Sequence, residues 1–198
     1  AHRRVVFNGN GYAEEWIAEA EKRGLPNISS TVEAIPQLVD QKSIDLFQRH
    51  KVFLEEELHS RCEIYLEKYA KQINIEGSIA LEMARTQVYP AALGYAGSLA
   101  TSLNAMAGAA PDLDLSVHTE HLQELNSLLS SLKRSADALA EALKSALAAE
   151  EVNRSARLYR ESVLPAMGVV RSAGDALEAL VPKDRWPFPG YEELLFRL

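Results

Sequence analysis

The sequence LQELNSLLSSLKRSADALAEALKSA occupies residues 122–146 and has the most regular pattern in the chain. Its apolar residues recur at alternating steps of three and four, and they are Leu122, Leu125, Leu129, Leu132, Ala136, Leu139, Leu143 and Ala146. A period of about 3.5 residues places one apolar stripe along a helix, as in the seam of a coiled coil. We therefore predict a long helix that packs this stripe against another helix.

A second stripe with the same period follows a turn at Glu150 and Glu151. Its members are Val152, Ala156, Tyr159, Val163, Ala166, Val170, Ala173, Leu177 and Leu180. Two consecutive helices with matching stripes predict a left-handed antiparallel hairpin. Pro165 falls inside the second helix, where it predicts a local kink because proline cannot donate a backbone hydrogen bond.

The segment from Leu54 to Met106 also has a helical pattern. We predict that its buried stripe consists of Leu58, Cys62, Tyr65, Tyr69, Ile73, Ile79 and Met83. Pro90 predicts a kink near Val88, and residues 108–116 predict the loop to the next helix. The expected fold is all-α, a bundle of long kinked helices that includes an antiparallel coiled-coil-like hairpin.

The N-terminal part has a different character. Residues 2–7 resemble a strand, residues 8–11 (NGNG) predict a tight turn whose glycines tolerate positive φ, and a short helix should follow and end at Gly24. Trp16, Ile17 and Ala20 would form its apolar face. Two more short helices are expected near Ser30 or Thr31 and from Ser43 to His50, the latter burying Ile44 and Phe47. We divide the chain into residues 1–53, a strand remnant with short helices, and residues 54–198, the long-helix bundle. A chain that opens on a strand segment is expected to be a piece of a longer protein.

Composition narrows the range of partners. The 198 residues have a net charge of -7 and a pI near 5.3, and no basic stripe is present to neutralise phosphates, which disfavours nucleic acid and anionic membranes as partners. Cys62 is the only cysteine, so the sequence allows no intrachain disulfide and no thiolate zinc site. Charged residues interrupt every apolar run, and no leader precedes Val5. We expect a cytoplasmic protein that does not contact a membrane.

Two patterns resemble metal ligands. Glu56 and His59 have the spacing found in carboxylate-bridged metal bundles, but such a site needs a second pair, which the sequence lacks. His118 and His121, with Glu120 and Glu124 nearby, lie one turn apart at a helix start, where such residues more often cap the helix. We predict no metal ligand in the chain.

The remaining polar groups are also better explained as structural. Residues 8–11 lack the glycine spacing of a phosphate-binding loop, and the acidic run at residues 55–57 fits the start of a helix. We therefore predict no catalytic and no cofactor-binding residue. Gln72, Asn74 and Glu76 interrupt the apolar stripe, so we expect them to contact a neighbouring domain.

Several separated blocks resemble one known family. Residues 4–12 (RVVFNGNGY), together with Glu15-Trp16, Glu19-Ala20 and residues 22–25 (KRGL), are similar to the C-terminal region of the type III glutamine synthetases. The resemblance continues through residues 31–34 (TVEA), 55–61 (EEELHSR), 63–67 (EIYLE) and 73–76 (INIE) to Trp186-Pro187 and Leu195-Phe196. These blocks lie in the same order as in the family and cover the whole chain.

The resemblance implies a parent enzyme that ligates ammonia to glutamate through a γ-glutamyl phosphate, using ATP and Mg²⁺ or Mn²⁺. None of the family's catalytic motifs matches this chain, so no residue receives a catalytic role, and the fragment itself is expected to be inactive. Residues 1–53 would be the end of the catalytic framework, and residues 54–198 an accessory domain with a structural, oligomerisation or regulatory role. Its implied partners are the catalytic domain of the same polypeptide and neighbouring subunits of a ring oligomer.

Two other hypotheses stay open at this stage. One is a free-standing helical-bundle interaction module, which requires a gene without an upstream catalytic segment. The other is a metal-dependent bundle enzyme, which elemental analysis would test.

Overall fold

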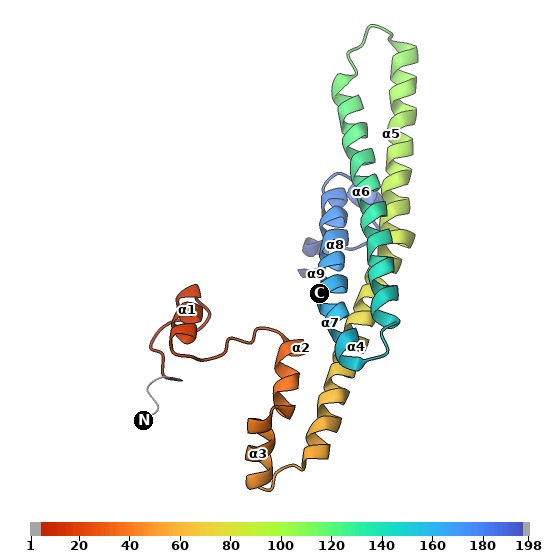
Figure 1. The fold of residues 1–198 in the computed structure, drawn as a ribbon. Helices are drawn as coiled ribbons and strands as arrows, with labels where there is room; N and C mark the ends of the chain where they lie inside the picture. The colour runs from red at the N-terminus through yellow and green to blue at the C-terminus, as the bar shows by residue number, and fades with distance from the viewer. Residues whose placement is uncertain (1–4, 196–198) are drawn as a thin grey trace. The chain divides into compact units, whose positions relative to one another are not determined.

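The computed structural model describes residues 5–195, and helices are the only regular secondary structure among these residues (Figure 1). In chain order they are α1 (Glu14–Lys22), α2 (Thr31–Ala34), the 3₁₀ helix η2 (Ile35–Val39), α3 (Gln41–Arg49), α4 (Glu55–Met83), the π segment η3 (Ala84–Val88), α5 (Tyr89–Ala109), α6 (Ser116–Leu147), α7 (Val152–Leu158), the π segment η4 (Tyr159–Val163), α8 (Leu164–Glu178), the 3₁₀ helix η5 (Lys183–Arg185) and α9 (Tyr191–Leu195). The predicted all-α fold is confirmed. No strand occurs among residues 5–195, and residues 2–4 of the predicted strand segment lie outside the described part.

Contacts divide the chain into two compact units, residues 1–65 and residues 66–198. The boundary falls inside α4, one continuous helix that begins in the first unit and continues into the second. Each unit is described by itself. The domain boundary predicted between residues 53 and 54 lies just before α4. This division into two domains stays a prediction.

Arg23 organises the start of the first unit. Its guanidinium pairs with Glu19 at 2.6 Å, donates to the Val6 carbonyl at 2.8 Å and lies over the rings of Phe7 and Trp16, whose centroids are 4.6 Å apart. These contacts fold the segment before α1 back onto that helix. The glycine at position 9 permits this, because an added Cβ would lie 2.6 Å from the Phe7 ring.

The predicted ends of the short helices are close to the observed ones. Gly24 has a φ of 66° and follows the last residues of α1, and the Ser30 hydroxyl accepts from the amide of Glu33 at the start of α2. Ala20 and Ile44 are buried as predicted, and Phe47 is half-buried, but Ile17 is 46% exposed. The predicted apolar face of α1 therefore includes one residue too many. The NGNG glycines do not adopt positive φ; among the described glycines only Gly24 does.

In the second unit, α6 is the central helix of the bundle. It packs against α5 on one side and against α7, η4 and α8 on the other, and both neighbours run antiparallel to it (Figure 1). Seven of the eight predicted stripe residues of α6, from Leu125 to Ala146, are buried, and Leu122 is half-buried. In the second stripe Ala156, Tyr159, Val163, Val170, Ala173 and Leu177 are buried. The two stripes thus form one apolar core, and left-handed supercoiling of the hairpin stays a prediction.

The buried register of α4 differs from the predicted one. Leu58, Cys62 and Ile73 are buried as predicted, but Tyr65 is 43% and Ile79 is 51% exposed. The buried positions of α4 in their place include Leu66, Ala70 and Gly77, and Ala84 is buried in η3. Small residues bring the backbone of α4 close to its neighbours, and a search for bulky apolar residues overlooks them.

Each predicted proline kink is a π segment. The amide of Tyr89 donates to the carbonyl of Ala84, and the amide of Leu164 donates to the carbonyl of Tyr159. Each of these hydrogen bonds joins residues five positions apart, as in a π-helix. Pro90 and Pro165 follow directly after these donors. A proline inside an α-helix would clash with the carbonyl four residues earlier, and the wider turn relieves that clash. The proline helices are therefore locally widened, and both continue beyond the proline.

An ion-pair cluster fixes the first π segment to the central helix. Arg85 in η3 donates to the Asp137 carboxylate on α6 at 2.8 Å, and Lys133 binds the second oxygen of the same carboxylate. The Lys133 ammonium and the Arg85 guanidinium together hold the pKa of Asp137 below its usual value.

The loop from residue 110 to residue 115 joins α5 to α6, as predicted within two residues. Within residues 5–195, every helix is either too short or too polar to cross a bilayer.

Candidate functional site

The residues with metal-ligand spacing do not assemble into a metal site. The His59 Nε2 atom lies 4.0 Å from the carboxylate of Glu55, its partner one turn away, and both side chains are about half exposed. His121 Nε2 lies 3.2 Å from the Tyr95 hydroxyl. In the described part of the chain no three His, Cys, Asp or Glu side chains gather in one place. These residues therefore do not fit the divalent metal that the family implies, and we derive no step through such a metal.

The acidic run at the start of α4 caps this helix. The Glu57 carboxylate accepts from the amide of Leu54 at 2.7 Å, which satisfies one of the backbone donors that a helix start leaves unpaired. The NGNG turn is closed in a similar way, because the Asn10 side chain accepts from the amide of Tyr12 at 3.0 Å. Both segments have the structural role that the sequence indicates.

The three polar residues in α4 have two different environments. Gln72 donates to Glu76 at 2.7 Å on an exposed face of the helix, where contact with a neighbouring domain stays a prediction. Asn74 instead bonds inside the bundle, where its side-chain oxygen accepts from the Tyr159 hydroxyl at 3.0 Å. Tyr159 is only 2% exposed, and burial raises the pKa of its hydroxyl, which therefore stays a neutral donor.

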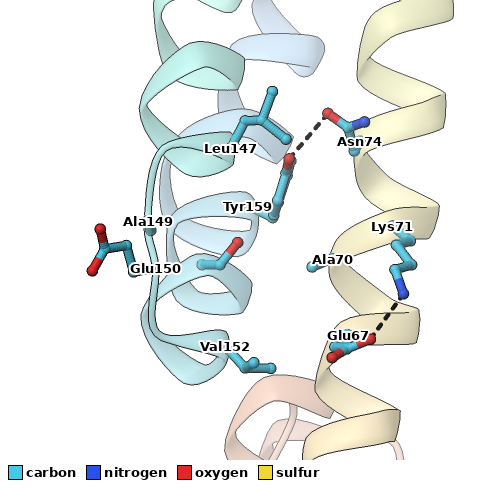
Figure 2. Close-up of a pocket in the computed structure, with 10 residues that line it drawn as sticks. Glu67, Ala70, Lys71, Asn74, Leu147, Ala149, Glu150, Val152 and Tyr159 are labelled. Carbon is cyan, nitrogen blue, oxygen red and sulfur yellow. Dashed lines mark hydrogen bonds and ion pairs between the residues drawn. The ribbon is translucent and has the colours of Figure 1, made fainter.

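Figure 2 shows the pocket around this hydrogen bond, a hollow of about 200 Å³ between α4 and the turn that joins α6 to α7. Glu67, Ala70, Lys71 and Asn74 line one side, and residues from Leu147 to Tyr159 line the other. Lys71 is bound by Glu67 at 2.8 Å, and the Ser155 hydroxyl donates to the carbonyl of Ala146 at 3.0 Å, which ties α7 to the end of α6. The polar groups of the pocket thus hold three helices in register.

A larger hollow of about 410 Å³ lies between the end of α4, α8 and the segment after η5. Large apolar side chains line it, among them Met83, Met167, Trp186 and Phe188, and Gly168 and Gly174 line it from α8. We call this hollow the methionine groove. Its lining is largely apolar, and the sequence reading did not identify it.

The segment before the groove is tied to α5. Arg185 donates to the Ser98 hydroxyl at 2.6 Å and lies over the Tyr95 ring, with 6.0 Å between the guanidinium carbon and the ring centroid. Trp186 and Phe188 meet edge to face, with centroids 6.2 Å apart. The aromatic pair is therefore placed against the bundle by contacts far apart in the sequence.

The fold is helical, and the polar contacts described above, such as Tyr159 with Asn74 and Arg185 with Ser98, join one helical segment to another. These features define a helical structural domain. The model of the glutamine synthetase C-terminal domain family matches residues 1–107, which is more than half of the chain. The chain belongs to this family.

Longer proteins resemble the whole chain. It is 37% identical over 202 residues to a glutamine synthetase of Butyrivibrio fibrisolvens, an alignment that covers 100% of this chain and 28% of that protein. It is 35% identical over 202 residues to a type-3 glutamine synthetase of Dictyostelium discoideum, covering 98% of this chain and 27% of that protein. A glutamine synthetase of Bacteroides fragilis is 32% identical over 200 residues, covering 99% of this chain and 27% of that protein. The chain thus spans just over a quarter of the length of the curated relatives that it matches.

Proposed function

We propose that this chain is the C-terminal helical domain of a longer type III glutamine synthetase, and that its work there is to pack against the catalytic part and to support subunit assembly. The observation that carries the proposal is the match of the whole chain to a little over a quarter of longer glutamine synthetases, one of them a type-3 enzyme. In this proposal the parent ligates ammonia to glutamate with ATP and Mg²⁺ or Mn²⁺ in the cytoplasm, on residues upstream of this chain.

The architecture of the second unit suits a supporting role. The α6 stripe consists of fully or almost fully buried side chains such as Leu125, Leu132 and Leu139. A close-packed core of this kind has low compressibility, so it keeps its shape when other parts of a protein pack against it. Several apolar side chains nevertheless face outward, among them Ile75 and Ile79 one turn apart on α4. Exposed apolar positions beside a rigid core are suited to contact with another part of a protein.

An activity comparison tests this proposal. The 198-residue chain alone and the complete polypeptide encoded by its gene are each incubated with glutamate, ammonia, ATP and Mg²⁺, and glutamine is measured. We expect glutamine only from the complete polypeptide. Glutamine formation by the 198-residue chain alone would overturn the proposal, as would a gene in which no catalytic segment precedes Ala1, which would favour the free-standing interaction module.

A further inference from the structure

The methionine groove is shaped by residues that leave space open. Met83 lines it from α4, Met167 and Val170 line it from α8, and Trp186 and Phe188 line it from the segment after η5. A Cβ added at Gly168 or at Gly174 would meet no atom within 4 Å.

Gly168 and Gly174 lower the stability of α8, and neither is required for the packing of another described atom. Each glycine in a helix interior costs about 1 kcal/mol relative to alanine, yet neither of these two makes room for a neighbouring atom of the described chain. Gly77 on α4 is a contrast, because a Cβ there would lie 3.0 Å from Leu143 and 3.1 Å from Val163. Gly94, Gly97 and Gly108 on α5 are equally open, so an open glycine does not by itself mark a contact. Gly168 and Gly174 differ because they line the methionine groove, where the space above them can receive an inserted side chain. Two methionines beside them provide side chains that can adapt to an inserted group.

The edge of the groove is acidic. Asp175 and Glu178 lie on its α8 side, and Arg171 pairs with Asp175 at 3.4 Å. Two carboxylates and one guanidinium give this edge a net negative charge, which favours a partner with a lysine or arginine. A second copy of the chain is a poor occupant, since a symmetric contact would bring the two acidic edges together in a chain of net charge -7.

We propose that the methionine groove seats a segment from the rest of the same longer polypeptide, which inserts an apolar side chain over Gly168 and Gly174 and places a basic side chain beside Asp175 and Glu178. This inference rests on the proposed function. Most of the length of the matched relatives lies outside this chain, because the alignment covers only 28% of the Butyrivibrio protein. The groove is thus a docking surface between the helical domain and its parent.

Thiol labelling tests whether the groove is covered. Gly168→Cys is introduced both into the 198-residue chain and into the complete polypeptide, and the rate of reaction with a maleimide is measured. Gly94→Cys on α5 is the matched control, because an added Cβ there also meets no atom within 4 Å. The native Cys62 gives little background, since it is buried and burial raises the pKa of its thiol.

We expect labelling at position 168 to be at least about tenfold slower in the complete polypeptide than in the 198-residue chain, with the rate at position 94 nearly unchanged. Adding Glu178→Lys should restore most of the rate at position 168 in the complete polypeptide, whereas Glu141→Lys on α6 should not. Equal rates at position 168 in the two proteins would overturn the inference. Slow labelling in the 198-residue chain that depends on its concentration would also overturn it, by indicating a second copy. The activity comparison above is independent of these rates, so failure of the inference and failure of the proposed function are distinguishable.

Discussion

The hydrogen bond between Tyr159 and Asn74 gives a prediction that can be worked from the structure. Tyr159→Phe keeps the buried ring and removes only the hydroxyl that donates to Asn74 at 3.0 Å. Such a bond contributes a net of about 0.5–1.5 kcal/mol. Asn74 is half-buried and lines an open pocket, so water can replace the lost donor. We therefore expect a loss of about 1 kcal/mol in the free energy of unfolding, at the low end of the roughly 1–3 kcal/mol that an orphaned buried acceptor costs.

Urea unfolding followed by far-ultraviolet circular dichroism measures this change. Tyr12→Phe is the control, because Tyr12 is 100% exposed and its hydroxyl should contribute nothing measurable. A double-mutant cycle with Asn74→Ala isolates the pairwise coupling, which should be about 1 kcal/mol. A coupling of zero would refute the claim that this bond fixes α4 to the hairpin.

The same residue sets a pH dependence at alkaline pH. Burial raises the pKa of Tyr159, so the folded chain favours the neutral hydroxyl. Its contribution to stability is fully present below the ordinary tyrosine pKa of about 10 and is lost as pH rises through the raised folded value. Tyr159→Phe should reduce this alkaline loss. Part of the loss should persist, because burial also raises the pKa of Tyr69.

Three further predictions follow from the bundle. Leu139→Ala removes a side chain that is 0% exposed and should cost about 2–5 kcal/mol in the free energy of unfolding, whereas Leu147→Ala, at a position 72% exposed on the same helix, should change it by less than about 0.5 kcal/mol in urea titrations. Gly94→Ala should raise the thermal midpoint, since its Cβ meets open space, while Gly77→Ala should be less stable than Gly94→Ala by at least about 1 kcal/mol because its Cβ presses on two core side chains. Asp137 has a lowered pKa in the folded chain, so its contribution to the free energy of unfolding is present above its usual pKa and is lost as pH falls through the folded value. Asp137→Asn should therefore make the free energy of unfolding less dependent on pH in the acid range. An unchanged dependence would contradict this prediction.

The sequence predicted the all-α fold and most of the buried positions of α6 and the following helices because these stripes are dense and regular. Leucine or alanine recurs along α6 without a gap, and six of the nine matching positions of α7, η4, α8 and the residues after it are buried. For α4 the same reading failed at Tyr65 and Ile79. That helix uses Ala70 and Gly77 for close contact, and residues this small carry little weight in a search for apolar periodicity.

The sites were less predictable than the fold. The hydrogen bond between Asn74 and Tyr159 joins residues 85 positions apart, and the methionine groove combines α4, α8 and the segment after η5. No local pattern identifies such combinations, because they depend on how the helices pack.

The central claim is that these helices support a larger enzyme, and the mass of the assembly tests it most directly. Multi-angle light scattering is applied to the complete polypeptide and to a version that ends before residue 54, which removes α4 and everything after it. We predict that the complete polypeptide forms a ring-sized oligomer and that the shortened version falls to smaller species. A shortened version with the same number of subunits and undiminished glutamine formation would contradict the account.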